Sequence, residues 1–150
     1  MVRFASAALI SVLGFAISSA AFAVKPEDAI EYRKGVMAAQ GWNFGAMGAM
    51  VKGEQPYDKA EFLKRAENLA ALTKMSLEGF TIEGSDKGKT KAKPEVWQEM
   101  EKFKGGTEKL ATESAKLVTA AQGGEMPAIK AQFNEVAKVC KGCHDNFRSK

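Results

Sequence analysis

The chain has 150 residues, of which 45% are hydrophobic and 27% are charged, and its formal net charge is +4. A chain of this length forms one ordinary domain with its own hydrophobic core. Its lysines are scattered rather than clustered, so the small positive excess does not indicate a nucleic-acid-binding surface.

Residues 1–23 have the layout of a secretory signal peptide. Arg3 gives a positive start, an apolar run follows over roughly 4–17, and small residues lead to Ala21-Phe22-Ala23. The alternative is a membrane anchor, but this run is short for a hydrocarbon layer of about 30 Å. We therefore expect cleavage after Ala23 and export of residues 24–150. Since no later stretch has eighteen apolar residues, no membrane-spanning segment is expected.

The first predicted helix covers residues 26–51, where apolar and small residues recur at spacings of three and four. Its expected inner face consists of Ile30, Arg33, Met37, Gln40 with Gly41, Phe44, Gly48 and Val51. A second strip on the same helix consists of Trp42, Gly45, Ala46, Ala49 and Met50. A bundle helix needs one buried stripe, so the second strip predicts contact with a second subunit or with the linker that follows.

Three further helices are expected. The second opens at Asp58, with Glu61 three residues later in a capping-box pattern, and carries apolar positions as far as Phe80. The third begins at Pro94 and the fourth at Pro127, since proline suits a first helical turn. Turn-rich segments separate the helices, and a lysine-rich stretch over 83–93 is long enough to cross one end of a bundle. The pattern predicts an all-α fold, an antiparallel four-helix bundle.

The sequence CKGCH contains both cysteines and the single histidine of the chain, Cys140, Cys143 and His144. Spacings of three and four residues place all three on one face of the last helix, the face that also carries its apolar stripe. This is the haem attachment signature, in which two thiols form thioether bonds and the histidine binds the iron. Three other interpretations of the motif are less favoured. A disulfide would close a very short loop and add little stability, and a thioredoxin-like redox pair needs a βαβ unit, whereas no strands are predicted. A zinc site needs four ligands, and the chain has no further cysteine or histidine.

Three segments together resemble the cytochrome c′ family, the class II c-type cytochromes of the bacterial periplasm. They are KPEDAIEYRKGVM followed by GWNFG, the KPEVW that opens the third helix, and VCKGCHDNFR near the C-terminus. The resemblance covers essentially all of residues 24–150. It implies one covalently bound haem c inside a four-helix bundle, a five-coordinate iron that binds NO and CO, a homodimer formed by the first two helices, and a periplasmic location.

The resemblance also assigns individual residues. Cys140 and Cys143 match the thioether cysteines, and His144 matches the axial iron ligand. Arg33 matches an arginine near a haem propionate, Met37 matches the position over the iron on the vacant side, and Arg148 matches a basic residue beside the histidine. Lys34 departs from the family, where glutamine is common. By spacing alone, Met37 is also a candidate core residue, and Arg148 a candidate solvated cation.

Two functions follow from this assignment. In the first, the protein binds diatomic gases at an open sixth position of the iron, with a role in nitric oxide handling or in electron transfer to an unidentified partner. In the second, Met37 is the sixth ligand and the protein is a low-spin electron carrier. Peroxidase-type catalysis is not expected, since a distal acid–base group is usually histidine and the single histidine is assigned to the iron.

Overall fold

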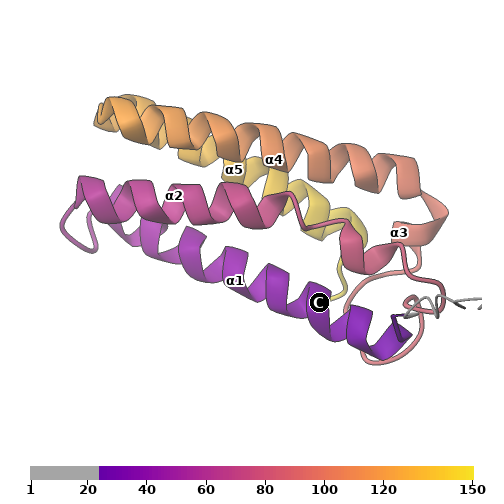
Figure 1. Cartoon of the computed structure of the whole chain (residues 1–150). Coiled ribbons are helices and arrows are strands. Elements are labelled where there is room, and N and C mark those ends of the chain that lie inside the picture. Colours follow the sequence, from indigo (N-terminus) through magenta and orange to yellow (C-terminus); the bar gives the residue numbers. More distant parts are fainter. Residues whose placement is uncertain (1–23) are drawn as a thin grey trace, which may run out of the picture.

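The computed structural model describes residues 24–150, which form an antiparallel bundle of four long helices (Figure 1). The helices are α1 (Pro26–Lys52), α2 (Lys59–Thr73), α4 (Met100–Gly123) and α5 (Met126–Phe147). A short 3₁₀ helix, η1 (Glu78–Phe80), and one turn of helix, α3 (Glu95–Gln98), lie in the long connection between α2 and α4. The predicted all-α four-helix bundle is confirmed. The predicted signal peptide, residues 1–23, lies outside the described residues.

Most helix ends follow the signals in the sequence. Pro26 and Pro127 lie in the first turns of α1 and α5. The side chain of Asp58 accepts a hydrogen bond of 3.0 Å from the backbone N–H of Glu61, as the capping box predicts. Helix α1 ends at Gly53, whose φ of 78° is a left-handed conformation that glycine adopts without a steric penalty.

Two boundaries differ from the sequence-based expectation. The second helix ends at Thr73, so Phe80 belongs to η1 and not to a continuous helix. The third helix is interrupted at Glu99, whose φ of −118° and ψ of 43° are not helical, so Pro94 precedes α3 and the long helix α4 starts at Met100. The break does not occur at Gly105-Gly106, through which α4 continues.

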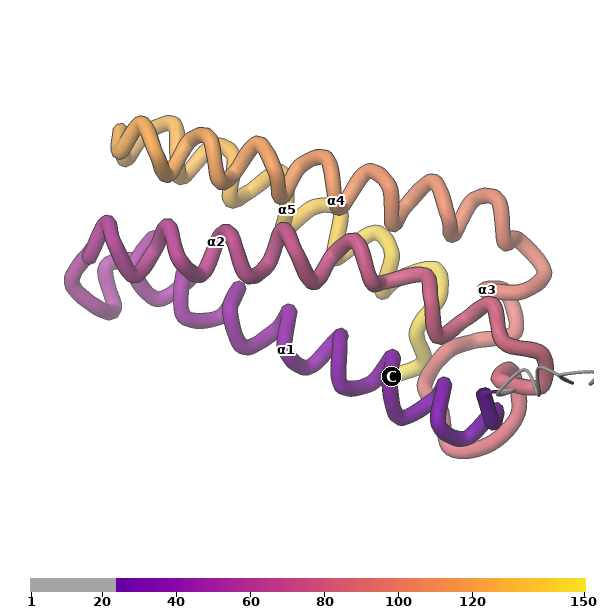
Figure 2. Tube along the Cα trace, in the orientation of Figure 1, coloured from indigo at the N-terminus to yellow at the C-terminus, as the bar shows by residue number. Residues whose placement is uncertain are grey.

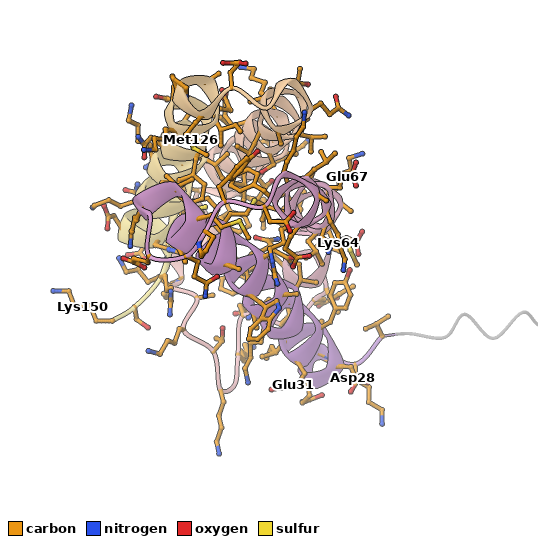
Figure 3. All side chains as sticks on the ribbon, turned by 90° about the vertical axis from the view of Figure 1, so that its left-hand side faces the viewer. Asp28, Glu31, Lys64, Glu67, Met126 and Lys150 are labelled. Carbon is orange, nitrogen blue, oxygen red and sulfur yellow. The ribbon has the colours of Figure 1, made fainter. Side chains whose placement is uncertain are left out.

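The helices pack in the order α1, α2, α4, α5, and within this ring α1 and α5 touch least. Figure 2 shows that the α1–α2 and α4–α5 turns meet at one end of the bundle, while the long connection and the C-terminus lie toward the other. We call these the hairpin end and the loop end. Viewed along the bundle, the labelled polar residues Asp28, Glu31, Lys64 and Glu67 point outward (Figure 3). Among residues 24–150, no helix has the length and apolar character needed to span a bilayer.

The core is divided into two clusters. The main core joins buried side chains of α1, α2, α4 and α5, among them Met47, Phe62, Leu117 and Ile129. A smaller aromatic cluster at the loop end consists of Phe80, Val96, Phe103 and Phe147. Met50, expected on the outer strip of α1, is instead part of the main core and only 8% exposed.

Candidate haem site

The CKGCH residues occupy the last two turns of α5, where the two clusters adjoin. Cys140 packs against the main core, whereas Cys143 packs against the aromatic cluster. Both thiols are free and half-buried, and His144 is open to solvent. The motif therefore presents two thiols toward apolar surroundings and one imidazole toward the outside.

The local environment favours the neutral form of all three groups. Burial raises the pKa of the Cys140 thiol, and it raises the pKa of the Cys143 thiol together with the nearby Cys140. The pKa of His144 is lowered, first by the protein that surrounds part of the ring and then by the positive charge of Arg148, against a smaller opposite effect of Asp145. A neutral imidazole is the form that binds a metal.

Two hollows adjoin the motif. A cavity of about 300 Å³ between α4 and α5 is lined by Cys143 and Phe147 and by two glycines, Gly106 and Gly142. A Cβ atom at either glycine would meet nothing within 4 Å, so both positions border open space. A second hollow of about 220 Å³ is lined by His144, Asp145, Arg148 and neighbouring residues. Space is thus present beside both a thiol and the imidazole.

Met37 lies on the same cluster as Cys143, although the two residues come from α1 and α5. It is partly buried and packs against the aromatic cluster. Since α1 and α5 touch least among neighbouring helices, Met37 and the CKGCH residues belong to the pair of helices that the polypeptide itself joins least tightly. A flat apolar group could therefore enter between them with little loss of helix–helix contact.

Arg33 is the buried cation of the loop end, with 3% of its surface exposed. Its Nη1 donates to the carbonyl of Gly79 at 2.9 Å, and its Nη2 donates to the carbonyl of Ser85 at 2.8 Å and to Thr90 Oγ1 at 3.0 Å. The guanidinium also lies 4.5 Å from the centre of the Phe80 ring. Gly79 is required here, because a Cβ at that position would lie 2.7 Å from the carbonyl oxygen of Ala29.

The charge of Arg33 is not neutralised by an ion pair within residues 24–150. Burial lowers its pKa, and the more distant charge of Asp86 opposes that effect. A buried cation is stabilised by an anion, and three of its five N–H groups are used in the bonds described above. The remaining donors and the unpaired charge fit a carboxylate such as a haem propionate.

Arg148 and Lys34 lie on the surface. Arg148 is the first residue beyond α5, and its backbone N–H donates to the carbonyl of His144 at 3.1 Å. Its side chain borders the same hollow as His144. Lys34 forms an exposed ion pair of 2.7 Å with Glu31.

Sequence reasoning missed several residues that shape the site. Phe80 was assigned to the second helix, yet its ring contacts Phe103 and lies beneath Arg33. Trp97 donates from Nε1 to the carbonyl of Phe80 at 2.9 Å and so holds this ring in place. Lys93, one of four lysines in the loop, bonds to the end of α5. Only the aromatic residues gave a signal, through their hydrophobicity.

The fold and the site define a class of protein: an all-α bundle with a haem attachment signature at the end of its last helix. Comparison with known proteins gives the same class. The sequence profile described as Cytochrome C' matches residues 28–148. Cytochrome c' of Halomonas halodenitrificans is 42% identical over 130 residues, which cover 83% of this chain and 98% of the relative.

Solved structures similar to this chain belong to the same class of protein. Cytochrome c prime from Shewanella frigidimarina has 44% identity and a TM-score of 0.81, with 84% of this chain and 98% of that chain covered. A variant of cytochrome c prime from Alcaligenes xylosoxidans with bound carbon monoxide has 35% identity and a TM-score of 0.77, with 84% and 98% covered. A ferrous variant of the same protein with bound NO has 34% identity and a TM-score of 0.77, with 84% and 97% covered. The chain belongs to the cytochrome c′ family, whose members bind haem c.

Proposed function

We propose that this protein is a periplasmic gas-binding cytochrome that carries one haem c, held covalently by Cys140 and Cys143 and bound at its iron by His144. The observation that carries the proposal is the position of these three residues. Both thiols lie against apolar clusters, and the imidazole of His144, which is exposed, borders a hollow. A ferrous haem with a vacant position supplies the affinity for NO and CO that side chains alone lack.

The other residues of the site have supporting roles in this proposal. Arg33 holds a propionate with its unpaired charge, and Arg148 modulates the charge around His144 from the surface. The aromatic cluster supplies apolar contact to the macrocycle and excludes water from that side. The function is binding and electron transfer rather than catalysis, because no second histidine is available as an acid–base group.

Met37 decides what the sixth position of the iron can do. Its side chain belongs to the aromatic cluster that also contacts Cys143, which supports a location on the vacant side of the haem. We infer that Met37 crowds this side without binding the iron, so that NO or CO must displace the side chain. The complexes of the Alcaligenes xylosoxidans protein with CO and NO support an open position. The alternative is a low-spin electron carrier in which the thioether of Met37 is the sixth ligand.

The test compares wild-type protein with Met37→Ala in the ferrous state. If Met37 is a gate, both proteins have a high-spin absorption spectrum, and the variant binds CO more tightly because no side chain must be displaced. Met50→Ala is the matched control, since Met50 is a buried methionine of the same helix that belongs to the main core. A low-spin wild-type spectrum that Met37→Ala converts to high-spin would identify Met37 as a ligand.

A homodimer through α1 and α2 is part of the proposal. Trp42 is 75% exposed, and Gly45, Ala46 and Ala49 follow it along α1 as small residues. Such a strip lets a second helix approach closely and cover the tryptophan. Sedimentation of Ala46→Glu should give a haem-containing monomer. A wild-type protein that is already monomeric at tens of micromolar, a range chosen to favour weak association, would refute the dimer.

A further inference from the structure

The last turn of α5 carries His144, and its carbonyl groups need partners from outside the helix. The final four carbonyls of any α-helix lack an intrahelical N–H donor. In α5 these belong to His144, Asp145, Asn146 and Phe147. The carbonyl of His144 has a partner in the residue that follows the helix, because the N–H of Arg148 donates to it at 3.1 Å.

A single residue from the long connection satisfies the other three. Lys93 Nζ donates to the carbonyls of Asp145 and Asn146, each at 3.2 Å. The backbone N–H of Lys93 donates to the carbonyl of Phe147 at 2.9 Å. The ammonium therefore lies at the negative end of the helix dipole, where a cation is stabilising.

Neighbouring bonds fix Lys93 itself. The N–H of Ser149 donates to the carbonyl of Lys91 at 2.8 Å, and Ala92 pairs with Arg148 in an antiparallel bridge. On the other side, Thr90 Oγ1 accepts a bond of 3.1 Å from the N–H of Ala92 and one of 3.0 Å from Arg33 Nη2. Residues 90–93 thus connect the end of α5 to α1 through hydrogen bonds.

We propose that Lys93 is a positioning residue for His144. By capping the C-terminal end of α5 from the loop, Lys93 fixes the position and orientation of the helical turn from which the imidazole of His144 reaches the iron. The effect on the iron rests on the proposed function, whereas the cap itself does not. Without the ammonium, two carbonyls lose their protein partners, and the last turn gains freedom to fray. The length and orientation of the bond between His144 and the iron then vary more from molecule to molecule.

The experiment compares Lys93→Met with Lys89→Met in the full-length mature protein. Each substitution removes one positive charge from the same loop and keeps an unbranched side chain, but the ammonium of Lys89 forms no hydrogen bond or ion pair within residues 24–150 and does not border the hollow beside His144. Lys93→Arg is the rescue variant, since its guanidinium retains donors for the carbonyls. Two measurements are made: amide hydrogen exchange, and the iron–histidine stretching band in the resonance Raman spectrum of the ferrous protein.

We expect exchange of the Phe147 and Arg148 amides to be about tenfold faster in Lys93→Met. The iron–histidine band should shift or broaden in this variant, and should keep its wild-type position in Lys89→Met and Lys93→Arg. Unchanged amide exchange would overturn the cap, and faster exchange with an unchanged band would overturn the positioning role. A wild-type protein without haem would instead refute the proposed function, while the exchange data would still decide on the cap.

Discussion

The hairpin end and the loop end of this bundle are stabilised by different chemistry. At the hairpin end, side chains such as Phe62, Leu117 and Ile129 are fully buried against one another. At the loop end, a smaller aromatic cluster adjoins a buried guanidinium that has no ion pair within residues 24–150, two half-buried thiols and an open cavity. The first end is complete as polypeptide, and the second has the features of a site that a haem completes.

The largest expected effect is at the hairpin end. Leu117 is fully buried in the main core, so Leu117→Ala should lower the free energy of unfolding by about 3 kcal/mol through lost burial and a residual cavity. Urea denaturation measures this loss. The ferrous absorption spectrum should not change, because Leu117 lies toward the hairpin end of α4, whereas Cys140, which packs against the same cluster, lies in the last two turns of α5 near the loop end.

Leu63→Ala is the control for this substitution. Leu63 packs against the same core but is only partly buried, so the loss should be about 1 kcal/mol. A changed haem spectrum in Leu117→Ala would show that the two ends are not independent.

A smaller loss is expected from Arg33→Met at the loop end. The substitution keeps an unbranched apolar stem but removes three hydrogen bonds that connect α1 to the carbonyls of Gly79 and Ser85 and to Thr90. Unpaired buried acceptors and the lost charge-assisted bonds should lower stability by about 2 kcal/mol. Unlike Leu117→Ala, this variant should also disturb the haem environment.

Lys34→Met is the control for the substitution Arg33→Met. It removes a cation from the next residue, but that cation forms only an exposed ion pair with Glu31, so stability should change by less than about 0.5 kcal/mol. Equal effects of the two substitutions in urea denaturation would mean that the buried bonds of Arg33 contribute nothing.

The smallest effect concerns a contact between α4 and α5. Glu113 accepts hydrogen bonds from Lys116 and from Gln132, at 2.9 and 2.7 Å, and these bonds lower the pKa of its carboxyl group. In the unfolded chain the pKa is the ordinary glutamate value of about 4.3. The stabilisation is therefore complete above that value and is lost as the pH falls through it and through the lower pKa of the folded state.

Glu113→Gln should accordingly reduce the dependence of thermal stability on pH in the acid range. Glu108→Gln on the same helix removes an exposed carboxylate whose side chain has no ion pair or hydrogen bond recorded among residues 24–150, and it is the control. If both variants follow the same pH profile, the bonds of Glu113 do not contribute to acid stability.

Much of the fold was predictable, because its signals are local. Asp58 with Glu61, Pro26 and Pro127 mark helix starts through capping and backbone geometry alone. The interruption at Glu99 was not predicted, since the residues from Pro94 onward carry a helical pattern, whereas the contacts of α3 are non-local: Val96 is buried in the aromatic cluster and Trp97 donates to the carbonyl of Phe80. Met50 was placed on the wrong face because small apolar residues surround α1 on several sides.

The site likewise contains residues that local sequence predicts and residues that only long-range contacts identify. CKGCH is a local motif, so Cys140, Cys143 and His144 could be assigned from spacing. Arg33 was correctly placed on the inner face, but its partners come from residues 46 to 57 positions later. Lys93 differs in no local respect from the other lysines of its loop, so only the folded structure identifies its three carbonyl partners.

The central claim is that the loop end is completed by a haem held covalently by the CKGCH residues. Its most direct test is the intact mass of the mature protein, measured under denaturing conditions after periplasmic expression with the c-type maturation machinery. The account predicts the mass of residues 24–150 plus one haem, and loss of the added mass in a variant with both Cys140→Ala and Cys143→Ala. A wild-type mass equal to the polypeptide alone would contradict it.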